Sequence, residues 1–147
     1  MVNTELAEFY QRDIEKLITE LNLVKDEEAL WKTTGTIKNS CGNLTLHLIG
    51  NLSYYIGKML GHSGYVRNRE LEFSAKNVSR HVMTDQLRAL IPLIVKTITS
   101  ISDQQLDEPY PEFFTKENAS IRHVLTHLLL HLNYHTGQLN YLRRALE

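Results

Sequence analysis

Apolar residues recur at intervals of three and four positions over four long stretches of the chain, a spacing typical of amphipathic helices. The first stretch covers residues 3–23, and the second covers residues 41–61, where Gly61 gives a stop signal. The third covers residues 84–102, and the fourth begins near Ser120 and continues to the C-terminus. The sequence therefore predicts four long helices that can bury apolar faces against one another.

The connections between these helices differ in length. Residues 62–83 show no sustained period and are predicted to form an ordered crossover that wraps one end of the molecule, whereas residues 103–118 are predicted to form a loop. Thr84 is the predicted N-cap of the third helix. Because Pro92 lies within that helix, we expect either a kink or a start later than residue 84.

Helices of this number and length predict an all-α protein, a four-helix bundle with a long crossover between the second and third helices. The chain of 147 residues is the size of one domain, which is expected to span residues 1–147. Its apolar fraction of 42% is that of a globular protein, and a chain of this length can bury a core without disulfides.

Charge and composition exclude several classes of function. The net charge is −1 and no basic run is longer than Arg143-Arg144, so neither a nucleic-acid surface nor an anionic-membrane surface is expected. The apolar runs are too short to span a bilayer. The segment MVNTELAEFY lacks the features of a signal peptide, and Cys41 is the only cysteine, so the expected location is the cytoplasm.

The fourth helix carries a histidine at every fourth position: His123, His127, His131 and His135. Each step of four residues drifts by about 40° around a helix. On that wheel His131 and His135 lie on the apolar face, His127 lies at its border, and His123 points toward solvent. Two buried imidazoles need partners for their nitrogens, and a shared divalent metal ion would supply both, as would hydrogen bonds to neighbouring groups.

His47 on the second helix is the candidate third ligand. It belongs to a polar stripe at the border of the apolar arc of that helix: Asn43, His47, Asn51, Tyr54 and Lys58. This stripe is either the polar wall of a cavity between the second and fourth helices or an ordinary solvated surface. Spacing alone slightly favours the solvated surface.

The segment HLNYHTGQL, which begins at His131, resembles the HxxxHxGQ motif on the last helix of the DinB-like (YfiT-like) metalloenzyme superfamily. The segments GNLTLHLIGNL and RNRELEF resemble a subfamily of unassigned function, so that the resemblance covers essentially the whole chain. It implies an up-down-down-up bundle, often a homodimer, with a metal site formed by His47, His131 and His135. Thr136 stands where many relatives have arginine, so no anion contact is expected from that position.

A site of three neutral imidazoles leaves coordination positions open for water or substrate, as in catalytic metal sites. The expected ion is divalent, zinc or nickel. The resemblance does not fix one activity, because the superfamily includes thiol transferases, a thiol-dependent isomerase and many members with no known reaction. A transferase that acts on a small-molecule substrate with a low-molecular-weight thiol is the first candidate, whereas a water ligand would indicate a hydrolase. The alternatives are a non-catalytic metal-binding or stress-related protein, and a helical interaction protein without metal. The sequence leaves open whether the site is catalytic.

Other polar residues are weaker candidates. Three of them could orient a ligand but equally fit packing or surface roles: Asn51, Tyr54 and Gln138. Arg67, Arg69 and Glu70 lie in the crossover, where a loop-fixing salt bridge is favoured over a cap on the site. Cys41 begins the second helix, where a helix N-terminus can stabilise a thiolate, but an isolated cysteine is more often a small apolar residue.

Overall fold

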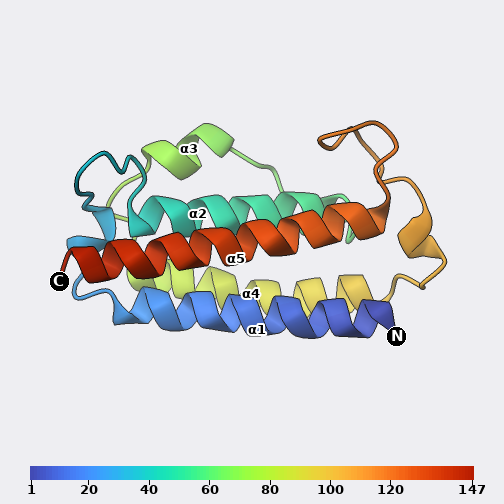
Figure 1. Ribbon diagram of the computed structural model, residues 1–147, viewed down its shortest axis with the longest axis horizontal. Coiled ribbons are helices and arrows are strands. Elements are labelled where there is room, and N and C mark those ends of the chain that lie inside the picture. The colour runs from blue at the N-terminus through green and yellow to red at the C-terminus, as the bar shows by residue number, and fades with distance from the viewer.

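The computed structural model describes all residues from 1 to 147 and is built of helices and loops, without a β-strand. Four long helices lie side by side along the molecule (Figure 1): α1 (Val2–Leu23), α2 (Cys41–Leu52), α4 (Arg80–Thr99) and α5 (Ile121–Ala145). Helices α1 and α5 run in one direction, and α2 and α4 run in the other. The predicted all-α bundle and its up-down-down-up order are confirmed.

Shorter elements join the long helices: η1 (Ala29–Trp31), η2 (Ser53–Lys58), α3 (Arg69–Ser74) and η3 (Gln105–Asp107). η2 is a π-helical turn that continues α2, and within it the N–H of Met59 donates to the carbonyl of Tyr54 at 3.0 Å. The helix predicted over 41–61 is therefore one continuous segment that changes its hydrogen-bond pattern after Leu52. A π-helical segment of this kind is common beside functional sites.

The crossover contains more regular structure than the sequence predicted. Helix α3 and the first turn of α4 both fall within residues 62–83. The crossover also returns along the side of the bundle, outside α2, and does not simply wrap one end (Figure 1). This path follows from topology, because α2 and α4 are parallel and the chain must travel back along the molecule before α4 can begin.

Helix α4 begins earlier than predicted. Its N-cap is Ser79, whose hydroxyl oxygen accepts from the N–H of Val82 at 3.2 Å, whereas Thr84 is buried inside the helix. The guanidinium of Arg80 donates to the carbonyls of Asn22 and Val24 at the end of α1, at 3.0 and 2.6 Å. These tertiary contacts stabilise a first turn that has no periodic apolar signal, and the later start expected from Pro92 is wrong.

The core joins all four long helices. Each contributes fully buried apolar side chains, for example Tyr10, Leu48, Leu87 and Leu132. Full burial of one such side chain stabilises the fold by about 1.5–3 kcal/mol. Helix α2 packs against α4 and α5, and α5 also packs against α1, so α2 and α5 face each other across a seam. No helix combines the length and the apolar character required to cross a membrane.

We expect Pro92→Ala to stabilise the protein. α4 continues through Pro92, which is exposed and lacks the N–H that the carbonyl of Arg88 would otherwise accept. Proline is about 3 kcal/mol less favourable than alanine within a helix, and the structure has already adapted to the ring, so we expect a gain of about 1–2 kcal/mol. Urea denaturation measures it.

The matched control is Gln86→Ala, a substitution at another exposed position of α4, which should change the free energy of unfolding by less than about 0.5 kcal/mol. A loss of stability in Pro92→Ala would mean that the ring itself makes a stabilising contact.

Candidate metal centre

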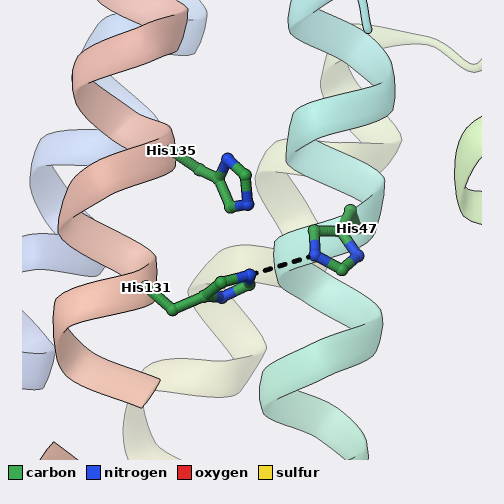
Figure 2. Close-up of side chains that lie close together, drawn as sticks. All are labelled: His47, His131 and His135. Carbon is green, nitrogen blue, oxygen red and sulfur yellow. Dashed lines mark hydrogen bonds between the residues drawn. The ribbon is translucent and has the colours of Figure 1, made fainter. Parts of the chain in front are cut away.

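Three histidines converge between α2 and α5. His131 and His135 lie on successive turns of α5, and His47 points toward them from α2 (Figure 2). One ring nitrogen from each residue lies within 4.8 Å of the others, and the Nε2 atoms of His47 and His131 are 3.2 Å apart. The structure thus brings together the three residues that the sequence singled out. Within the polar stripe, His47 is buried at the seam, whereas Lys58 is exposed.

The geometry suits a single ion. Zinc binds imidazole nitrogen at about 2.0–2.1 Å, so that tetrahedral ligand nitrogens lie about 3.3 Å apart. The Nε2 atoms of His47 and His131 already have this spacing. The ring of His135, which is only half-buried, would move closer to these two nitrogens to bind the same ion. Imidazole nitrogens are ligands that zinc, nickel and copper accept well.

Glu72 on α3 fixes the orientation of His47. The Nδ1–H of His47 donates to Glu72 Oε1 at 3.0 Å, which leaves the lone pair of its Nε2 directed toward His131. Arg67 donates to both oxygens of the same carboxylate, from Nε at 2.9 Å and from Nη2 at 3.0 Å. A carboxylate behind a histidine fixes its tautomer and raises its basicity as a ligand.

Gly50 makes room for this carboxylate. A Cβ atom at Gly50 would lie 1.9 Å from Glu72 Oε2, so α3 can approach α2 this closely only where there is no side chain. The amide of Asn43 ties the same segments together by donating to the carbonyls of Glu72 and Ala75, at 3.0 and 2.9 Å. The crossover is therefore held against α2 at the level of His47.

Sequence reasoning did not find Glu72. Among the crossover residues it singled out, Arg67 forms the salt bridge, but Glu70 is exposed and Glu72 is the buried partner. One available signal was Gly50, three residues after His47 inside a helix. Glycine there is unfavourable by about 0.5–1 kcal/mol unless another segment approaches closely.

Burial favours the neutral forms of His47 and His131. It lowers the pKa of His131 to about 4, with smaller contributions from the neighbouring His135 and His47. Burial also lowers the pKa of His47, although the hydrogen bond to Glu72 opposes this effect. Neutral imidazoles keep the lone pairs that a metal ion requires.

The other candidate residues take different places. Gln138 Oε1 accepts from the Nδ1–H of His135 at 2.6 Å and so orients that ring. The hydroxyl of Tyr54 instead donates to Glu112 at 3.1 Å. Thr136 is buried, donates to the carbonyl of Leu132 and borders a polar groove shared with α1, away from the three histidines.

The remaining histidines of α5 lie outside the cluster. His127 is exposed, with its ring centroid 5.1 Å from that of Phe114. His123 is half-buried and therefore less exposed than the helical wheel predicted. Cys41 is buried, and burial raises the pKa of its thiol to about 11, so the thiolate that a helix N-terminus could have stabilised does not form at neutral pH.

A solvent-open pocket of about 230 Å³ lies beside the histidines. It is bordered by α2, by α5, by the crossover and by the loop before α5. His47 and His131 line it together with Asn51, Tyr55, Arg67, Arg69, Phe114, Thr115, His127 and Leu128. Three imidazole ligands next to such a pocket would leave coordination positions that a substrate can reach.

The sequence matches one protein family, DUF1572, described as a protein of unknown function, over residues 3–147. The chain belongs to this family. No curated protein matches the sequence of this DUF1572 member.

Two solved structures are similar to this DUF1572 chain. A conserved protein from Enterococcus faecalis is 17% identical, with a TM-score of 0.80 over 98% of this chain and 96% of that one. A DinB-like protein from Bacillus cereus is 19% identical, with a TM-score of 0.71 over 91% and 85% of the two chains. The fold is therefore DinB-like, as the sequence resemblance predicted.

Gly50→Ala should destabilise the protein by about 1–3 kcal/mol, because the added methyl group overlaps the Glu72 carboxylate and must displace it from His47. Gly137→Ala on α5 is the matched control. No atom lies within 4 Å of the Cβ that it adds, so it should stabilise the helix by about 0.5–1 kcal/mol. Thermal unfolding measures both variants. Equal melting temperatures for Gly50→Ala and the unsubstituted protein would contradict the close approach of α3 to α2.

Proposed function

We propose that this protein is an enzyme that holds one divalent metal ion on His47, His131 and His135 and uses it on a small-molecule substrate. The observation that supports this proposal is the convergence of three imidazole nitrogens beside a solvent-open pocket, with all ligand atoms within 4.8 Å of one another. A closed structural site would instead surround the ion with four protein ligands. Zinc and nickel are the proposed ions.

The chain's own residues would prepare the site. Glu72 accepts a hydrogen bond from the Nδ1–H of His47, and Gln138 accepts one from the Nδ1–H of His135, so that the Nε2 atoms of both rings are free to bind the ion. When bound, the ion would lower the pKa of a coordinated water or thiol and so supply a nucleophile near pH 7. No side chain at the pocket supplies a nucleophile in place of the ion, because the only cysteine is buried and neither Asp nor Glu lines the pocket.

A thiol is the better proposed nucleophile. A general base would assist water most, and the pocket offers no carboxylate for this role. Bulk water is a far weaker acid than a free thiol, whose pKa is about 8.5, so the thiol requires a far smaller shift of its pKa to ionise at neutral pH. The resemblance to thiol-transferring relatives points the same way. A hydrolase is the second candidate, and a cytoplasmic homodimer is the proposed setting for either.

Metal analysis of protein purified without a histidine tag tests the site. His131→Ala should lower metal affinity by more than about 100-fold, because even outer partners of a metal ligand typically contribute 10–100-fold. His123→Ala is the control, since His123 lies on the same helix but outside the cluster. It should leave one ion per chain. Equal loss of metal from both variants would contradict the assignment of His131.

Activity would be tested with low-molecular-weight thiols and a generic electrophile. We expect thiol-dependent turnover in the metal-loaded protein and at least a tenfold loss in His47→Ala. Turnover of an ester without added thiol, lost in the same variant, would favour the hydrolase. Full metal content without turnover of any substrate would favour a non-catalytic metal-binding protein.

A further inference from the structure

One wall of the pocket carries polar atoms without partners. Asn51 follows His47 by one turn of α2 and is only 7% exposed, yet its Oδ1 has no hydrogen-bond partner. The Nδ1 of His131, across the seam, is also buried and unpaired. A buried polar group without a partner is unfavourable by about 1–3 kcal/mol. Both residues line the pocket through their other atoms, since these two atoms are themselves buried, and they make this wall of the pocket polar.

The charges around the pocket have one sign. Arg67 and Arg69 line it from the crossover, and no acidic side chain does. Arg67 is neutralised by its bond to Glu72. Arg69 is exposed, forms no salt bridge, and lies over the ring of Phe73 with its guanidinium carbon 5.4 Å from the ring centroid. A free guanidinium therefore lies at the edge of a pocket that is also lined by two of the three converging histidines, His47 and His131.

We infer that the substrate is a small organic anion whose carboxylate or sulfonate group binds Arg69 while its reactive end faces the three histidines. This inference rests on the proposed function and adds the substrate class. The planar guanidinium matches such anionic groups in a two-bond geometry. The aromatic side chains of Tyr55 and Phe114 also line the pocket and would contact a short carbon chain. The volume of about 230 Å³ limits the ligand to a small molecule.

Three thiols of similar length test the inference, because they differ mainly in the charge at the far end: 3-mercaptopropionate, 2-mercaptoethanol and cysteamine. Their affinities for zinc-loaded protein would be measured by calorimetry, with zinc content checked before and after each titration. The ratio of affinities between the unsubstituted protein and Arg69→Gln removes the intrinsic difference between the thiols. We expect a five- to tenfold loss for 3-mercaptopropionate, no loss for 2-mercaptoethanol and no loss for cysteamine.

The control is Arg88→Gln, which removes an exposed arginine on α4 that does not line the pocket. It should leave all three affinities unchanged. 2-Mercaptoethanesulfonate, added as a fourth ligand, tells whether the site prefers a planar carboxylate or accepts a sulfonate.

The outcomes separate this inference from the proposed function. Equal effects of Arg69→Gln on all three thiols, with zinc still bound, would overturn the anionic substrate but leave the metal site intact. Failure of the protein to bind zinc or any thiol would overturn both. A loss for 3-mercaptopropionate that Arg88→Gln reproduces would show a general effect of net charge and would also overturn the role of Arg69.

Discussion

The candidate site depends on the buried contact between Glu72 and His47. A carboxylate that is only 6% exposed is unfavourable unless its oxygens are compensated, and here the Nδ1–H of His47 and the guanidinium of Arg67 do so. The same bonds fix the tautomer of His47, hold α3 against α2 and place Arg67 and Arg69 at the pocket. Loss of this contact would therefore alter the metal ligand, the crossover and the pocket wall together.

The topology explains why such a contact is available. Since α2 and α4 are parallel, the chain between them must return along the outside of α2 (Figure 1). A shorter connection would suffice between antiparallel neighbours. The returning segment covers the polar face of α2 that carries Asn43 and His47, and Gly50 lets it approach closely. The long crossover thus supplies a carboxylate that neither α2 nor α5 carries beside the three histidines.

The sequence predicted what repeats and missed what depends on single distant contacts. Periodicity located the four long helices, and the HxxxH spacing on α5 located His131 and His135, because both patterns are local. The early start of α4 depends on Arg80 binding to the end of α1. Glu72 reaches its partner His47, which lies 25 positions earlier in the sequence, only in the folded chain. His47 lay between these cases, since the helical wheel placed it on a border that only the packing of α2 against α5 could resolve.

Hydrogen bonds within the protein do not pair all the buried ring nitrogens of this histidine cluster. Because the Nδ1–H of His47 donates to Glu72, the Nε2 of His47 can only accept a hydrogen bond. The Nε2–H of His131 must therefore donate the one bond that joins the two rings. The Nδ1 of His131 is then a buried acceptor without a donor. An unpaired buried acceptor is unfavourable by about 1–3 kcal/mol, so hydrogen bonding within the core does not account for His131. The chain instead keeps three convergent imidazoles next to solvent, an arrangement that favours ligand binding over stability.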